Sequence, residues 1–330
     1  MTNIHQTSGR WRLGLALSLV TVFLWGILPI ALSVTLQKID VYTITWFRFL
    51  IAFVLLAIYL GIYGNLPTLT RLRSTSWKLL AIATIFLASN YILFLQGLML
   101  TSPSNAQVLI QLAPLFMGLG GLVIFREQYT LAQWIALGIL SLGFILFFHE
   151  QLLQSFLGIY QSTNSSQIYL EFNGYQIIIH PAQKYLIGTG LIVLAAATWA
   201  IYALAQKQLL KSLSSANIML LIYGGCTLLF SVFAKPKTIL LLDAFHLGIL
   251  FFCALNTLIA YGAFSEALEH WEASRVSAVL ACTPIVTLLS LGFVSVIAPN
   301  LIASEQLTLV GILGAILVVI SSVAIAWNKR

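Results

Sequence analysis

Long apolar runs joined by mostly short polar linkers constrain this chain more than any other feature. A helix needs about 20 mostly apolar residues to cross a bilayer. Ten runs qualify, at residues 12–36, 42–64, 77–100, 103–125, 130–149, 185–206, 214–234, 243–264, 275–298 and 306–327. Because the bilayer core offers no water, each run must satisfy its backbone polar groups internally, which favours helices. The expected fold is all-α, a polytopic membrane protein with ten transmembrane helices.

Composition argues against a soluble protein. Of the 330 residues, 60% are hydrophobic and 8% are charged, whereas a soluble domain carries about 25% charged residues. The net charge of +7 comes from lysines and arginines that stand singly at the ends of apolar runs. That distribution is typical of membrane topology signals and not of a basic nucleic-acid surface. We therefore expect membrane lipids, and no nucleic acid, as partners.

The placement of the basic residues predicts the orientation in the membrane. Ten spans put both termini on one side, together with Arg10, Arg12, Arg71, Arg73, Lys78, Arg126, Lys207, Lys211, Arg275, Lys329 and Arg330. The other side has Lys38, Lys184, Lys235 and Lys237. The positive-inside rule then places the N- and C-termini in the cytoplasm, for a protein of the bacterial cytoplasmic (inner) membrane.

One linker, residues 150–184, is much longer than the others. It contains "YQSTNSSQ" and then "QIYLEFNGYQIIIH". Asn173-Gly174 between two β-prone runs predicts a β-hairpin with a two-residue turn. By the orientation above, this linker is extracytoplasmic. Two interpretations stay open: a connection that only folds locally, or a cap over the outer vestibule or contact for a partner.

The two halves of the chain repeat each other. The stretch "SNYILFLQGLMLTSPSNAQVLIQLAP" (89–114) aligns without gaps with "IAYGAFSEALEHWEASRVSAVLACTP" (259–284). Aligned pairs in the two halves are Tyr91 with Tyr261, Phe94 with Phe264, Pro114 with Pro284 and, earlier in each half, Trp25 with Trp199. The chain therefore divides into a first five-helix repeat (1–149), the linker, and a second five-helix repeat (185–330).

Five helices per repeat is an odd number, so the second repeat starts on the opposite side of the membrane from the first. Inverted repeats of this kind are typical of secondary transporters, whose solute site lies near the midplane between the halves. Two related units facing opposite ways supply an outer and an inner gate. The alternative is a duplicated scaffold without a transport role.

A short polar motif, called the repeated phrase below, also occurs twice in the sequence. "FREQYTL" begins at residue 125 and "ASEQLTL" at residue 303, and each places Glu-Gln-x-Thr-Leu before the last apolar run of its half. Glu127 and Glu305 suit the positive end of a helix dipole, while Thr130 and Thr308 suit N-caps. A structural role as helix starts is favoured over a chemical one.

Several of these stretches together resemble one transporter family. They are "FLWGILPIAL" (23–32), "TWFRFLIAF" (45–53), "LAPLFMGLGGLVIFREQYTLAQWIALGILSLGFIL" (112–146) and the second copy "TPIVTLLS…SEQLTLVGILGAILVV". They are similar to the EamA branch of the drug/metabolite transporter (DMT) superfamily. The resemblance covers nearly the whole chain. It implies an exporter-like carrier with an inverted five-plus-five repeat, in a family that moves amino acids, nucleotide-type metabolites, drugs and other small solutes.

Polar side chains inside the spans are candidates for contact with a solute, because polar groups facing lipid are costly. Gln107 and Gln111 lie one helical turn apart in the fourth span, and Ser277 occupies the equivalent face of the ninth. A glutamine amide suits amide, carboxylate or base edges. Asn90 and Asn256 are weaker candidates. Hydrogen bonding between helices is an equal alternative for the glutamines.

Aromatic residues form a second set of candidates. Trp25 and Trp199 are expected as gate or stacking residues from their repeat symmetry, Tyr202 lies one turn from Trp199, and Tyr91 pairs with Tyr261 across the repeats. Aromatic side chains that line a cavity would suit planar or apolar solutes. Packing at the membrane interface is the alternative, because tryptophan and tyrosine favour that depth.

Three prolines inside spans, Pro29, Pro114 and Pro284, each remove one helix hydrogen bond. We expect them to act as hinges or to free carbonyls for solute, with a static kink as the alternative. Arg48 is the one charge well inside a span, and a structural clamp on carbonyls and attraction of an anion weigh equally. Glu266 is a candidate for proton coupling, against a hydrated inner loop with ion pairs.

No Walker loop, metal-ligand spacing or catalytic cluster is found in the sequence, so no cofactor, metal or enzymatic activity is expected. The main hypothesis is a secondary transporter that exports small organic metabolites by alternating access, with a small-molecule solute as partner and a homodimer left open. The alternative is a membrane-embedded scaffold, receptor or enzyme that reuses the same fold.

Overall fold

A computed structural model gives the architecture of the chain. It describes residues 9–67, 75–113, 116, 130–149, 168–172, 175–179, 181–210, 212–271, 276, 279–301 and 308–327. In the first half, the helices are α1 (Trp11–Leu36), α2 (Val41–Ile62), α4 (Trp77–Leu100), α5 (Pro103–Leu109) and α7 (Leu131–Phe147). In the second half, they are α9 (Pro181–Leu209), α10 (Ser215–Ser231), the 3-10 helix η1 (Pro236–Leu241), α11 (Ala244–His270), α13 (Thr283–Ile297) and α14 (Leu309–Trp327).

Within the described residues, each of the ten predicted spans contains an α-helix. Five helices, α1, α2, α4, α9 and α11, are long and apolar enough to cross a membrane. Four shorter apolar helices, α7, α10, α13 and α14, have described apolar segments of 10–17 residues. α5 is described over seven residues, and its predicted span continues beyond the described residues.

Polar residues at the expected positions start the helices. Thr130 forms a capping box with Gln133 at the start of α7: the Gln133 amide donates to Thr130 Oγ1 (3.3 Å), and the Thr130 amide donates to Gln133 Oε1 (2.9 Å). At the start of α14, the Gly311 amide donates to Thr308 Oγ1 (3.2 Å). The repeated phrase therefore starts the last helix of each half, as predicted. Glu127 and Glu305 lie outside the described residues.

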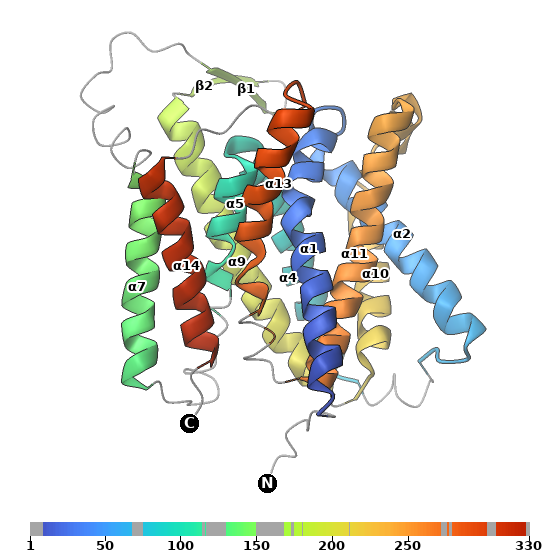
Figure 1. The fold of residues 1–330 in the computed structure, drawn as a ribbon. Coiled ribbons are helices and arrows are strands. Elements are labelled where there is room, and N and C mark those ends of the chain that lie inside the picture. The colour runs from blue at the N-terminus through green and yellow to red at the C-terminus, as the bar shows by residue number, and fades with distance from the viewer. Residues whose placement is uncertain are drawn as a thin grey trace.

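The two repeats run in opposite directions. In Figure 1, α1 begins and α14 ends at the lower end of the bundle, while α9 begins at the upper end and runs downward. The strands β1 (Ile168–Phe172) and β2 (Tyr175–Ile179) lie at the upper end. They pair antiparallel, with Phe172 opposite Tyr175. The pairing brackets Asn173-Gly174, the predicted turn, which lies outside the described residues.

Equivalent helices make equivalent contacts in the two repeats, as a two-fold relation requires. α1 of the first repeat packs along α11 of the second. Their equivalents, α9 of the second repeat and α4 of the first, also pack along each other. Likewise α2 contacts α11 while α10 contacts α4, and α1 contacts α13 while α9 contacts α5. α2 pairs with α10 and α7 with α14, each helix with its own repeat mate. These contacts agree with two repeats of opposite orientation and put the seam between them at the centre of the bundle.

The exchange extends to individual atoms. The Asn90 side chain donates from Nδ2 to the Ala195 carbonyl (2.8 Å) and thereby joins α4 to α9. At the aligned positions of the other crossing, Thr21 Oγ1 donates to the Ala260 carbonyl (3.4 Å) and joins α1 to α11. Asn90 aligns with Ala260, and Thr21 aligns with Ala195. Both crossings therefore have a hydrogen bond at the same place. In one the donor lies on α4, and in the other it lies on α1, which is the equivalent of α9.

Two aligned glycines allow these crossings to be close. A Cβ atom built on Gly14 would lie 2.5 Å from Cβ of Trp271, and one built on Gly188 would lie 2.7 Å from Cβ of Leu100. Such distances are too short for real Cβ contacts, and small residues at helix interfaces let the backbones approach closely. Gly14 lies near the start of α1 at the lower end, and Gly188 lies near the start of α9 at the opposite end, so there is a tight crossing toward each end of the bundle.

Three buried apolar clusters surround the seam. The first includes Leu32 and Ile44, the second Phe49 and Tyr202, and the third Val22 and Phe264, joined by the side chains around them. Trp25 of α1 packs against all three clusters. The centre of the bundle is therefore ordered around this tryptophan.

Candidate functional site

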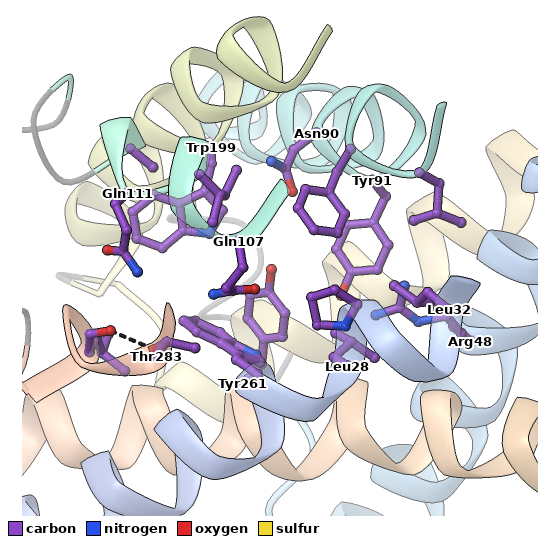
Figure 2. A pocket seen from close by; sticks show the side chains of 17 residues that line it. Leu28, Leu32, Arg48, Asn90, Tyr91, Gln107, Gln111, Trp199, Tyr261 and Thr283 are labelled. Carbon is purple, nitrogen blue, oxygen red and sulfur yellow. Dashed lines mark hydrogen bonds between the residues drawn. The ribbon is translucent and has the colours of Figure 1, made fainter. Parts of the chain in front are cut away.

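A cavity of about 120 Å³ lies at the seam between the repeats. Its walls come from both halves: α1, α2, α4 and α5 of the first, and α9, α11 and α13 of the second, together with loop residues beside α5 and α13. Leucine, isoleucine and aromatic side chains cover most of the wall, and a few polar groups converge on it (Figure 2). That combination is typical of a small-molecule site.

Most residues predicted from the sequence do line this cavity. They are Trp25, Asn90, Tyr91, Gln107, Gln111, Trp199 and Tyr261, together with the proline Pro29 and the cation Arg48. The repeat alignment had paired two of these couples, Trp25 with Trp199 and Tyr91 with Tyr261. Residues far apart in the chain therefore meet on one surface.

Two predicted residues lie elsewhere in the core. Tyr202 is fully buried, and its hydroxyl lies 3.4 Å from Sδ of Met219 on α10. Asn256 is also buried, and its Nδ2 donates to the Leu24 carbonyl at 2.6 Å. Both side chains join neighbouring helices and are absent from the cavity wall as described.

Pro284 and Glu266 are not among the described residues of this wall either. Pro284 is buried in the first turn of α13. Glu266 is exposed on α11, where Oε1 lies 3.1 Å from Nε2 of His270. Pro114 and Ser277 lie outside the described residues.

Arg48 is held at one end of the cavity, next to Tyr91 and Leu32 (Figure 2). It comes from the first half of α2 and is only 2% exposed. Nε donates to Thr257 Oγ1 of α11 at 2.9 Å, and the guanidinium carbon lies 4.6 Å from the centre of the Tyr91 ring. Both contacts fix the plane of the guanidinium, since arginine stacks on aromatic faces and donates through a rigid fork.

Two glutamine amides also face the cavity. Gln107 lies in α5 and Gln111 follows four residues later, just beyond the end of this helix; each is 5% exposed. Neither side-chain amide has a hydrogen-bond partner among the described residues. An amide that faces a cavity keeps its N–H donors and its carbonyl acceptor free for other hydrogen bonds. Both amides are therefore available to a bound solute.

Aromatic side chains close another part of the wall. The Trp25 ring lies 5.1 Å from Tyr261 and 5.6 Å from Phe264, measured between ring centres. Phe264 in turn lies 6.2 Å from Trp199. Tyr261 reaches Tyr91 at 6.2 Å. This chain of ring contacts crosses the seam from α1 and α4 to α9 and α11.

The sequence prediction missed Thr283 and the apolar part of the wall. Thr283 lies on α13 opposite Gln111 (Figure 2), and its Oγ1 donates to the Leu280 carbonyl at 2.5 Å. Its repeat mate, Ala113, also lines the cavity. Both residues directly precede the aligned prolines, so the repeat alignment held the signal that would have found them.

A metal centre finds no support in the described part of the chain, where no three His, Cys, Asp or Glu side chains group together. The thiols of Cys226 and Cys253 are buried as free cysteines, as expected for packing residues. Within these described residues, the chemistry of the site is that of hydrogen bonding, ring contacts and one cation.

Comparison with known proteins agrees with this architecture. The model of the EamA-like transporter family matches residues 12–149 and 186–327. An uncharacterized inner membrane transporter, YhbE of Escherichia coli (strain K12), is 35% identical over 319 residues, covering 96% of this chain and 92% of the relative. An uncharacterized transporter of Haemophilus influenzae is 34% identical over 318 residues and covers 96% of both chains.

A solved crystal structure of a protein has the same fold. It covers 94% of this chain and 96% of its own, with a TM-score of 0.61 at 14% sequence identity. At this identity the likeness concerns the fold alone.

Proposed function

This chain is an inner-membrane protein that belongs to the EamA-like transporter family of the DMT superfamily. On that premise, we propose that it exports small organic metabolites from the cytoplasm. The proposed path runs through the cavity at the seam between the repeats. Alternating access follows if the two inverted repeats open the cavity to one side at a time. The observation that carries the proposal is the pair of unpartnered amides, Gln107 and Gln111, facing a cavity in the middle of an apolar bundle.

The solute-binding residues that we propose are those of the wall: Trp25, Asn90, Tyr91, Gln107, Gln111, Trp199, Tyr261 and Thr283. Tyr202 and Asn256 are proposed to support the wall from behind, because each bonds to a neighbouring helix. Pro29 lines the cavity from inside α1, and we propose it as the hinge that lets this helix bend.

The proposed orientation places both termini in the cytoplasm. In that arrangement, the start of α1 and the end of α14 face the basic, cytoplasmic side, and residues 150–184 form the extracytoplasmic linker between repeats 1–149 and 185–330. A reporter fused after Arg330 is expected to be active in the cytoplasm. An extracytoplasmic reading would reverse the proposed direction of export.

Flux through the purified full chain in proteoliposomes tests the function. Vesicles preloaded with a pooled metabolite extract are expected to release a subset of solutes, saturably and with acceleration by the same solute outside. Saturable exchange distinguishes a carrier from a channel. Vesicles that release no more solute than protein-free vesicles, for every compound of the extract, would contradict transport.

Alanine variants of two amide residues are expected to have opposite effects: one should lower solute affinity and the other should lower stability. Gln111→Ala should weaken solute affinity and leave thermal stability unchanged or slightly raised, because its amide faces the cavity without a partner among the described residues. Asn256→Ala should lower stability by about 0.6–2 kcal/mol and leave affinity unchanged, because it removes the bond to the Leu24 carbonyl. Thermal unfolding with and without a transported solute measures both. Equal effects of the two variants on affinity would remove Gln111 from the site.

A further inference from the structure

Arg48 is a buried cation for which the described residues provide no anion. Of the nine acidic residues, the structure describes the side chains of Asp40, Asp243 and Glu266. None of the three lies near Arg48. Asp40 caps α2, Asp243 bonds to His246, and Glu266 bonds to His270.

Most donors of the guanidinium are also unused. Nε is bound to Thr257, but no described residue accepts from the two terminal nitrogens, which carry four of the five N–H groups. The side chain is 2% exposed and lines the cavity. A buried charge that is neither paired nor fully hydrogen-bonded is strongly unfavourable. Because Arg48 lines the cavity, a bound solute could accept hydrogen bonds from its remaining donors.

We propose, on the basis of the proposed transport function, that the solute is an organic monocarboxylate whose carboxylate binds the terminal nitrogens of Arg48. The planar fork of arginine matches the two oxygens of a carboxylate in a bidentate pair. Tyr91 and Thr257 hold the fork in place by stacking and by the bond to Nε. Binding of the carboxylate neutralises the buried charge.

The charge of the cavity selects against phosphate esters. A phosphate monoester carries a charge of about −1.5 to −2 at neutral pH, whereas Arg48 is the one charged residue on the described wall. A phosphate would therefore leave net negative charge buried in the bundle. A carboxylate carries a single charge and leaves the site neutral.

The rest of the wall defines the body of the solute. Arg48 lies at one end of the cavity, Gln111 and Thr283 lie at the other, and Gln107 and Tyr261 lie between them (Figure 2). Apolar and aromatic side chains fill the wall between these polar ends. A fitting solute has its carboxylate at Arg48, an apolar or aromatic body, and a hydrogen-bonding group at the far end for the glutamine amides.

Ligand-induced thermal stabilisation of the detergent-purified full chain tests the proposal with three matched probes: 4-hydroxyphenylacetate, its primary amide, and 4-hydroxyphenyl phosphate. The carboxylate is expected to stabilise the wild type, and the amide and the phosphate are not. In Arg48→Met the apparent affinity for the carboxylate should fall about tenfold to a hundredfold, as for the loss of a charged hydrogen bond. Arg48→Lys should retain part of it. Arg12→Gln, which removes an exposed cation at the start of α1, is the matched control and should bind normally.

Stability without ligand separates an anion site from a structural clamp. Without solute, Arg48→Met should unfold at the same temperature as the wild type or higher, because an uncompensated buried charge is replaced by an apolar side chain of similar length. A clamp would instead lose stability. The proposal is overturned if the carboxylate fails to stabilise the wild type, if the amide or phosphate binds equally well, or if Arg48→Met keeps its affinity. Flux of neutral solutes in proteoliposomes would then leave transport standing and remove only the substrate class.

Discussion

Replacing Gly143 with leucine is expected to prevent the folded protein from accumulating, while the same change at Gly138 of the same helix is expected to be harmless. A Cβ atom on Gly143 would lie 2.9 Å from the backbone nitrogen of Val318 and 3.0 Å from the carbonyl oxygen of Gly314. Backbone atoms of α14 cannot turn aside as a side chain can. The two helices would have to separate, at a cost of more than about 3 kcal/mol.

The contact between α7 and α14 is built from small residues, so the two helices cannot make room for a leucine side chain by repacking. Small residues stand at aligned positions of the two helices: Ala136 and Gly143 on α7, and Gly314 and Ser321 on α14, all of them buried or in backbone contact. In a bilayer such close packing, and not the hydrophobic effect, holds helices together. Loss of the contact between α7 and α14 would therefore separate the last helices of the two repeats.

Gly138 provides the matched control, because a Cβ atom there would meet nothing within 4 Å. Both variants keep the same helix and the same change in side-chain size. The measurement is the fraction of detergent-extracted protein that elutes as a single species, followed by its unfolding temperature. If Gly143→Leu and Gly138→Leu gave equal yields and unfolding temperatures, the close approach of α7 and α14 would be refuted.

Trp25→Ala is expected to reduce saturable solute flux by about tenfold or more per folded molecule. Trp25 lines the cavity, contacts the rings of Tyr261 and Phe264, and packs against all three buried clusters. Truncating a fully buried tryptophan to alanine costs about 3–5 kcal/mol, and the half-buried Trp25 should lose a part of this. The lost packing energy falls at the centre of the seam, where a carrier binds its solute and where its two repeats move relative to each other.

Separate controls distinguish a lost binding surface from a damaged fold. Trp77→Ala removes a tryptophan that is 57% exposed at the start of α4, and its flux should match the wild type. Trp25→Phe keeps a ring at the seam and should recover most of the stability but less of the affinity. Initial flux rates over a range of solute concentrations, normalised to folded protein, decide the matter. Unchanged flux in Trp25→Ala would exclude this tryptophan from the transport path.

Local sequence signals gave the helices and their starts because those features depend on neighbouring residues. Thr130 and Thr308 cap their helices as the repeated phrase predicts. The structure adds paired crossings at aligned positions, Asn90 with Ala195 and Thr21 with Ala260. Such couples follow from duplication, since aligned residues occupy equivalent places in equivalent helices.

Helix rotation limited the prediction of the site. Tyr202 lies less than one turn from Trp199, yet it faces Met219 of α10 while Trp199 faces the cavity. Asn256 looks like any polar residue in a span, but it faces the Leu24 carbonyl of α1. A single sequence gives the periodicity of a helix but not which neighbour each face meets.

By itself, the sequence determined that this chain spans the membrane as paired bundles of opposite orientation, because apolar length, an odd helix number and self-similarity are properties of the chain. Only the tertiary structure decided which polar groups share a cavity and which are satisfied elsewhere. The bond from Arg48 to Thr257 joins residues 209 positions apart, and no local pattern encodes such a meeting. It depends on how the helices cross, and the crossing is set by packing of small and large side chains along the whole seam.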